Sequence, residues 1–117
     1  MSSTTPVERV RHVKQAISNV RAILHGKSMT QVESDIVRWP AFERYLEIIS
    51  EASRHIPEEW KTSYGSGLPW PQIADLGNRI RHVYHRVEVE VLWSTYVSDL
   101  DPLEAAIDRM LAAHPES

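Results

Sequence analysis

Apolar residues recur every three or four positions near the start of the chain, which is the period of an α-helix with one buried face. The apolar positions before Gly26 are Val10, Val13, Ile17, Val20 and Leu24. The preceding segment, Thr5-Pro6-Val7-Glu8, combines a capping box with a proline at the first helical position. The pattern predicts an amphipathic helix that starts at Pro6 and ends near Gly26.

The next two elements are predicted around a proline. Thr30-Gln31-Val32-Glu33 has the form of a second capping box, and it predicts a short helix that ends or kinks at Trp39-Pro40, because residues before proline avoid the α region. A broad apolar stripe follows, wide enough for a helix buried on much of its circumference. Its members are Phe42, Tyr45, Leu46, Ile48, Ile49, Ala52 and Ile56. This stripe predicts the central helix of the core.

The second half of the chain predicts three more helices after one loop. Residues 61–69 contain two glycines, two serines and a proline and are expected to form the loop. The apolar positions predict helices over residues 71–87 and from Val89 to Val97, and Asp101-Pro102-Leu103-Glu104 has the form of a helix start with an acidic N-cap. Residues 87–91 alternate like a strand, but the chain offers no partner strand. We therefore expect an all-α bundle of about five helices in one domain, residues 1–117.

Composition narrows the class of protein. The chain has 117 residues, no cysteine and a net charge of −3. It contains no apolar run near the roughly 20 residues of a bilayer span and no signal peptide pattern, so we expect a cytoplasmic protein with no membrane contact. The negative charge argues against a protein that coats nucleic acid non-specifically. Any contact with RNA must be local.

One segment is locally basic. Residues 76–87 contain no acidic residue but three arginines and two histidines. On a helical wheel, the polar side of residues 71–87 has His82 at its centre. The residues on this side are Asp75, Asn78, Arg79, His82, His85 and Arg86. Tyr84 lies at the boundary with the apolar side. Histidine, arginine and asparagine together can serve phosphate chemistry, because they supply a proton-transfer group, a cation and hydrogen-bond donors.

Two other interpretations of this segment stay open at this point. The first is an ordinary solvated helix surface, on which clustered histidines and arginines do nothing. The second is a metal site, in which His82 and His85, spaced i, i+3, bind a metal with Asp75. The sequence does not indicate that a His/Glu pair of another helix lies beside them to complete such a site. We therefore expect no metal and no cofactor.

The segment Gly77-Asn78-Arg79-Ile80-Arg81-His82-Val83-Tyr84 resembles the signature of the HepT-like HEPN proteins, which is Arg-Asn, three residues, His, one residue, Tyr. Three other blocks agree with this family in the same order. They are Leu46-Glu47-Ile48-Ile49-Ser50-Glu51-Ala52, similar to the family's Leu-Glu-Ile-Ile-Gly-Glu-Ala helix, Pro69-Trp70-Pro71-Gln72-Ile73-Ala74, and Val91-Leu92-Trp93 with Asp99-Leu100-Asp101-Pro102-Leu103. The resemblance covers nearly the whole chain.

This resemblance implies a metal-independent endoribonuclease, the toxin of a toxin-antitoxin pair, that works as a homodimer with its active site in a cleft between subunits. In that chemistry the ribose 2′-hydroxyl attacks the adjacent phosphate. His82 would transfer the proton and Asn78 would orient the substrate, with His85 nearby. Tyr84 would be the residue to which a cognate MntA-like nucleotidyltransferase antitoxin attaches AMP, which would silence the toxin. The implied partners are RNA, this nucleotidyltransferase and a second copy of the chain, but not DNA.

The chain departs from the family at one position, because Gly77 stands where the family has its catalytic arginine. Arg81 lies one turn later on the same face, and we expect its guanidinium to replace the missing cation, with help from Arg79. Gly77 could equally serve close helix packing at the dimer interface. The Gly77 face and His82 point about 140° apart on the wheel, so a shared site would need the second subunit. The alternative is a non-catalytic module that binds and regulates a nucleotidyltransferase.

Overall fold

The computed structural model of the chain describes residues 4–82 and 86–115, and every regular element in these ranges is helical. The elements are α1 (Pro6–Leu24), α2 (Met29–Glu33), α3 (Arg38–Ser53), α4 (Glu58–Gly65), α5 (Trp70–His82), α6 (Arg86–Ser94), the π-helical turn η1 (Thr95–Asp99) and α7 (Leu100–Ala113). The expected all-α fold is confirmed. Residues 87–91, which alternate like a strand, lie in α6.

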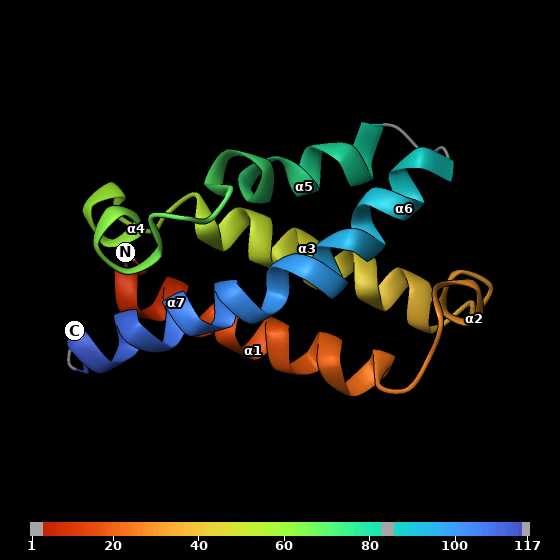
Figure 1. Ribbon diagram of the computed structural model, residues 1–117, viewed down its shortest axis with the longest axis horizontal. Coiled ribbons are helices and arrows are strands. Elements are labelled where there is room, and N and C mark those ends of the chain that lie inside the picture. Colours follow the sequence, from red (N-terminus) through yellow and green to blue (C-terminus); the bar gives the residue numbers. More distant parts are fainter. Residues whose placement is uncertain (1–3, 83–85, 116–117) are drawn as a thin grey trace.

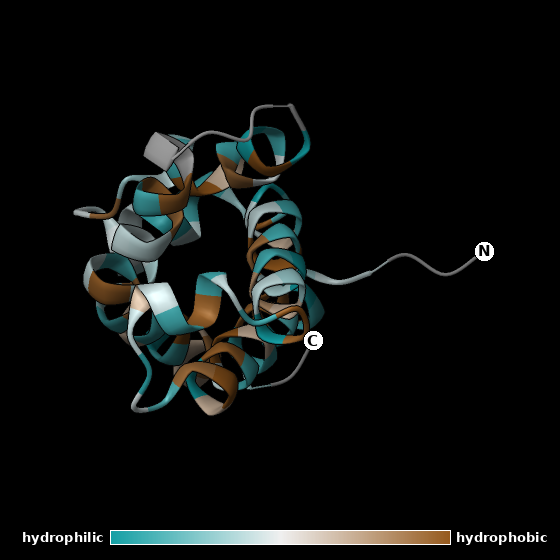
Figure 2. Ribbon diagram, turned by 90° about the vertical axis from the view of Figure 1, so that its right-hand side faces the viewer, coloured by the Kyte–Doolittle hydropathy of each residue, from teal (hydrophilic) through white to brown (hydrophobic). Residues whose placement is uncertain are grey.

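The long helices run back and forth across the molecule. In Figure 1, α1 and α7 form the lower part, α3 crosses the middle, and α5 and α6 lie above it. Helix α3 packs against α1 on one side and α5 on the other, and α7 packs against α1. Apolar and polar segments alternate along the helices (Figure 2), and the buried apolar side chains form one core cluster. Helix α3 is thus the central helix of the core, as its broad apolar stripe predicted.

The apolar positions predicted for the first helix are all buried. Val10, Val13, Ile17, Val20 and Leu24 have at most a trace of exposed surface. The predicted cap is also present: the Glu8 backbone N–H donates to Thr5 Oγ1 at 3.2 Å, and the Thr5 N–H donates to Glu8 Oε1 at 2.8 Å. Helix α1 therefore starts where its side chains satisfy backbone groups that would otherwise lack partners.

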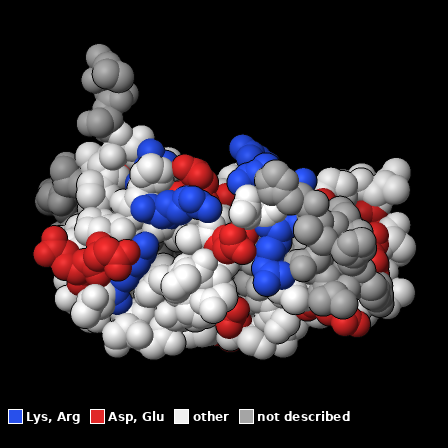
Figure 3. All heavy atoms as spheres, turned by 90° about the horizontal axis from the view of Figure 1, so that it is seen from above, with Lys and Arg blue, Asp and Glu red and all other residues white. Residues whose placement is uncertain are grey.

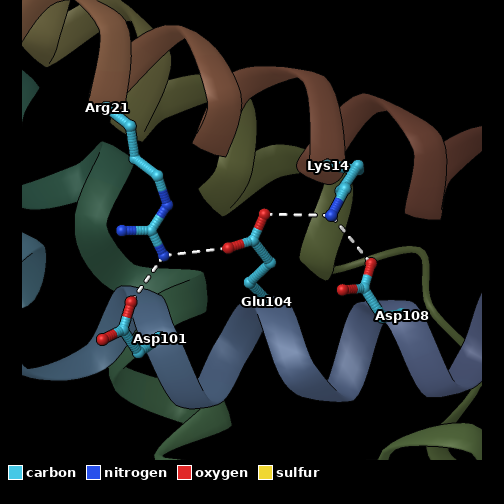
Figure 4. A network of polar contacts seen from close by, with 5 residues as sticks. All are labelled: Lys14, Arg21, Asp101, Glu104 and Asp108. Carbon is cyan, nitrogen blue, oxygen red and sulfur yellow. Dashed lines mark hydrogen bonds and ion pairs between the residues drawn. The ribbon is translucent and has the colours of Figure 1, made fainter.

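Two basic side chains of α1 fasten it to α7. Lys14 and Arg21 each bind the carboxylate of Glu104, at 2.9 Å in both cases. Lys14 also contacts Asp108 and Arg21 contacts Asp101, so five side chains form one network (Figure 4). Glu104 is the shared member that links the two basic side chains.

The predicted helix boundaries around Pro40 were wrong. The capping box belongs to Ser28 and Gln31, two residues earlier than predicted, and α2 ends at Glu33. Helix α3 already begins at Arg38, so Pro40 lies in its first turn. Proline is tolerated there because the N–H groups of a first turn have no intrahelical partner.

Two later boundaries also differ from the prediction. Residues 61–65 of the predicted loop belong to α4, whereas α5 is described as far as His82, so the predicted end of the helix over 71–87 is not tested. The last helix does not start at Asp101: α7 begins at Leu100 and continues directly from η1. A π turn adds a residue to the helical turn. This eases the clash that Pro102 would make in a continuous α-helix.

The four tryptophans lie in or against the core. Trp39 is buried and makes an edge contact with Phe42, with ring centroids 5.3 Å apart. Phe42 in turn contacts Trp93 and Tyr96. Trp60 and Trp70 are partly buried against the same cluster of core residues. These rings hold α3 against α6 and η1.

None of the helices in the two described ranges combines the length and apolar character that crossing a bilayer requires.

Candidate active site on helix α5

Helix α5 carries the signature segment and is held at its start by Trp70. The indole Nε1 donates to the Gly65 carbonyl at 2.8 Å, and the N–H of Trp70 donates to the Leu68 carbonyl at 2.9 Å. Ile73 and Leu76 are buried in the core. This leaves the opposite side of α5 at the molecular surface.

Ser50 of α3 joins this helix to α5 by two hydrogen bonds. Its hydroxyl is buried, donates to the Ala74 carbonyl at 2.7 Å and accepts from the Gly77 N–H at 3.1 Å. Arg54 also donates to the Ala74 carbonyl, through Nη2 at 2.9 Å. A Cβ at Gly77 would lie 3.4 Å from Ser50 Oγ. This is an ordinary contact distance, so an alanine at position 77 would fit against α3, and the role of Gly77 at a dimer interface stays a prediction.

The guanidinium of Arg81 folds back along α5 and lies over Gly77. Its Nη1 is 3.2 Å and its Nη2 3.7 Å from the position that a Cβ at Gly77 would take. Nη1 also lies 3.9 Å from Glu47 Oε2 on α3. The other carboxylate oxygen, Glu47 Oε1, lies 3.8 Å from Arg44 Nη1. With 56% of the Arg81 side chain exposed, the cation stays accessible from solution. The structure thus places a guanidinium in the space that Gly77 leaves empty.

Asn78 and Arg79 both turn toward Asp75. Asn78 Nδ2 donates to Asp75 Oδ1 at 3.4 Å, and Arg79 Nε lies 3.9 Å from Asp75 Oδ2. Arg79 lines a cavity on the side of α5 that faces α6, whereas Arg81 faces α3. The two arginines therefore lie on opposite flanks of the helix. Basic and acidic side chains alternate on the face seen from the α5 side (Figure 3).

His82 is the last residue of α5, and it follows Arg81 directly. The position of its side chain, and Tyr84 and His85 as a whole, lie outside the described residues. The predicted roles of these three residues therefore stay predictions. The same holds for the metal hypothesis with Asp75. Among the side chains that the structure describes, no three His, Cys, Asp or Glu residues are grouped as a metal would require.

A cavity of about 300 Å³ between α5 and the α6–η1 segment was missed by sequence reasoning. Asp99, at the end of η1, contributes a carboxyl group to its wall, and burial raises the pKa of this group. In the sequence Asp99 precedes a second aspartate and a proline, which is the pattern of a helix start. No sequence signal distinguishes a cavity wall from such a cap.

The comparison with known proteins agrees with the resemblance of the signature segment. The family described as "Ribonuclease HepT-like" matches residues 13–110. The chain belongs to the HepT-like ribonuclease family. An RNase candidate of Caldanaerobacter subterraneus is 30% identical over 107 residues, which are 92% of this chain and 95% of the relative.

Two archaeal HepT-like relatives match shorter parts. A protein named probable ribonuclease HepT, of Thermococcus cleftensis, is 36% identical over 67 residues, 57% of this chain and 60% of its own length. An RNase candidate of Methanocaldococcus jannaschii is 27% identical over 77 residues, 66% of this chain and 69% of its own length. No solved structure matches this HepT-like chain significantly.

Proposed function

We propose that this HepT-like protein is a metal-independent endoribonuclease in which Arg81 supplies the cation that Gly77 lacks. The observation that carries the proposal is the guanidinium of Arg81 beside Gly77, with Nη1 3.2 Å from the position of a Cβ there. A cation in this space can stabilise the negative charge that develops on a phosphate during cleavage. More than half of the Arg81 side chain is exposed, which leaves room for an RNA strand to approach the guanidinium.

The proposed reaction is an internal transfer at phosphorus. The ribose 2′-oxygen forms a bond to the adjacent phosphorus as the bond from phosphorus to the 5′-oxygen breaks. A base takes the 2′-hydroxyl proton and an acid protonates the departing 5′-oxygen. His82 is proposed for proton transfer, and Arg81 for the charge on the non-bridging oxygens, with Asn78 as a hydrogen-bond donor. The products are a 2′,3′-cyclic phosphate and a 5′-hydroxyl.

The proposed working form is a homodimer. The Gly77 face and His82 point about 140° apart on one helix, so one subunit's Arg81 and the other subunit's His82 would share a phosphate. In the toxin-antitoxin arrangement implied by the family, a cognate nucleotidyltransferase would attach AMP to Tyr84. The added negative charge would repel RNA from the site.

The test is cleavage of a short labelled RNA in EDTA by wild type, His82→Ala, Arg81→Ala and Arg79→Ala, with the RNA ends identified. We expect the wild type to leave 2′,3′-cyclic phosphate ends, and His82→Ala and Arg81→Ala to lose activity. Arg79→Ala tests the help expected from the other flank of α5, and Arg11→Ala, which removes an exposed arginine of α1, is the matched control. A wild type freed of any modification on Tyr84 that leaves RNA intact would contradict the proposal.

One observation favours a second function, a non-catalytic module that binds and regulates a nucleotidyltransferase. Glu47 lies 3.9 Å from Arg81 Nη1 and offsets part of its charge. Under this alternative Arg81→Ala leaves the affinity for a nucleotidyltransferase encoded beside the gene unchanged, and the wild type does not cut RNA. Binding measured by calorimetry together with the cleavage test separates the two functions.

A further inference from the structure

The cavity between α5 and the α6–η1 segment has walls of two kinds. Its apolar wall consists of Pro69, Ile73, Leu76 and Val91, and its polar groups are Gln72, Arg79, Ser94, Thr95 and Asp99. The volume of about 300 Å³ is at the lower end of the range for small-molecule sites. Such a site fits a flat ring with hydrogen-bonding edges better than a bulky or wholly apolar ligand.

Asp99 gives this cavity its chemical preference. Its side chain makes no hydrogen bond to cap α7, and among the side chains of residues 4–81 and 89–115 none donates a hydrogen bond to its carboxylate or forms an ion pair with it. Burial raises its pKa because no donor compensates for the lost water. An unpaired, partly buried carboxylate is costly, and a ligand with N–H groups would remove that cost.

The other polar groups complete the pattern. Thr95 Oγ1 already donates to the Val91 carbonyl at 3.1 Å, so it can only accept a further hydrogen bond. Gln72 is exposed at the edge of the cavity and can donate through its amide. Asp99 lies at the end of a π turn, a conformation that is frequent at functional sites.

We infer that this cavity binds a guanine base of the RNA substrate, with its two adjacent N–H donors on the Asp99 carboxylate. Guanine is the RNA base whose pairing edge carries two neighbouring donors, N1–H and the N2 amino group, which match the two oxygens of a carboxylate. Its O6 acceptor then faces donors such as the Gln72 amide, and its ring packs on Ile73 and Leu76.

The position of the cavity suits an RNA strand that crosses α5. Arg81 lies on the flank of α5 toward α3, and the cavity opens on the flank toward α6. A helix with its side chains is about 10 Å wide, which one or two nucleotides can span. This inference rests on the proposed function, because it takes RNA as the substrate whose phosphate meets Arg81.

The direct test measures binding of guanosine 5′-monophosphate and inosine 5′-monophosphate to the full-length protein by calorimetry or NMR titration. Inosine lacks only the N2 amino group. We expect guanosine monophosphate to bind about tenfold to a hundredfold more tightly, the discrimination typical of one bidentate base contact. Asp99→Asn should abolish the difference, because its amide places a donor against the guanine donors.

Two further variants make the result specific. Asp101→Asn is the matched control, since Asp101 is 83% exposed and contacts Arg21 outside the cavity, and it should bind like wild type. Ser94→Tyr should block the cavity and weaken binding while circular dichroism shows an unchanged helix content. Equal affinity of wild type for both nucleotides, or binding that survives both Asp99→Asn and Ser94→Tyr, would overturn the inference.

Cleavage separates this inference from the proposed function. Two RNAs that differ by guanine or inosine at one position should differ about tenfold or more in kcat/KM with wild type, but not with Asp99→Asn. Cleavage without any such preference overturns the guanine site and leaves the nuclease standing. Guanosine monophosphate binding that depends on Asp99 without cleavage of any RNA supports the cavity and contradicts the nuclease.

Discussion

Arg81 and Gly77 are related by one helical turn, and the guanidinium of the first lies beside the backbone of the second. The distance from Arg81 Nη1 to the position of a Cβ at Gly77 is 3.2 Å. A long side chain at i+4 reaches back over the preceding turn because helical side chains tilt toward the helix N-terminus. A cation can therefore stand near the family's arginine position although residue 77 has no side chain.

Gly77→Ala should separate activity from stability. The new methyl group would lie 3.2 Å from Arg81 Nη1, a tight contact that the guanidinium can relieve by moving, and 3.4 Å from Ser50 Oγ, an ordinary contact. Alanine also favours a helix by about 1 kcal/mol over glycine. We expect an unchanged or higher thermal midpoint and severalfold weaker RNA cleavage. A variant that melts normally and cleaves RNA like wild type would show that the position of Arg81 is unimportant.

An arginine moved from position 81 to 77 should restore part of the lost activity. Arg81→Ala alone should lower kcat/KM about a hundredfold or more, the usual effect of losing a group that stabilises developing charge. The double variant Gly77→Arg/Arg81→Ala should regain at least tenfold of this loss, because its guanidinium would start from the family position. Kinetics of the three proteins on one RNA provide the check. A folded but inactive double variant would mean that residue 81 has a role other than its charge.

The network between α1 and α7 predicts unequal effects of two neutralised carboxylates. Glu104 binds both Lys14 and Arg21, whereas Asp108 binds Lys14 alone. The hydrogen bonds that Lys14 donates to Asp108 and Glu104 raise the pKa of Lys14. Glu104→Gln should lower the free energy of unfolding by about 1 kcal/mol, and Asp108→Asn, the control, by less. Urea unfolding should show both losses shrinking in 1 M salt, because added ions screen these partly exposed pairs.

Asp35 should make the stability of the protein depend on pH at the acid end. Its carboxylate accepts hydrogen bonds from the backbone N–H groups of Val37 and Arg38 and lies 2.9 Å from the Arg38 guanidinium. These contacts lower the pKa of Asp35 to about 2, and the hydrogen bond from the Arg38 N–H is the largest cause. The folded-state pKa is below the unfolded value, so this contribution is present above about pH 4 and is lost as pH falls toward 2.

The measurement for Asp35 is the thermal midpoint of wild type and Asp35→Asn between pH 7 and pH 2. The variant should melt a few degrees lower at pH 7, and the gap should close at the acid end. A gap that stays constant across this range would show that the charge of Asp35 does not support the start of α3.

Asp99→Asn should keep or raise the stability of the free protein at neutral pH. Burial raises the pKa of Asp99, so the folded state binds this proton more tightly than the unfolded state. The free energy of unfolding therefore falls as pH rises from the unfolded value of Asp99 through its folded value. Asparagine carries no charge, so Asp99→Asn removes the free-energy cost of keeping an ionised carboxylate partly buried. Urea unfolding at pH 3 and pH 7 should show the variant gaining relative to wild type at the higher pH, and a clear loss at pH 7 would contradict a carboxylate without partners.

The sequence alone determined the helical class, the buried face of each long helix and the family. The apolar stripe of α1 and its Thr5–Glu8 cap are local signals, because both depend on residues within one or two turns of each other. Helix boundaries beside Pro40 and Pro102 were misplaced. Proline is disfavoured only in the interior of a helix. Whether a given proline falls in a first turn or beside a π turn depends on the elements packed around it.

The tertiary structure alone decided where the chemistry-bearing side chains point. The sequence suggested that Arg81 could reach the Gly77 space, but the contact depends on Ser50 and Glu47 of α3, which are distant along the chain and adjacent in space. Sequence reasoning assigned Asp99 no role of its own, and only the structure placed it in the wall of a cavity that Leu76 also lines. Periodicity assigns a residue to a face of its own helix, whereas a site forms from faces of different helices, and their packing fixes which faces meet.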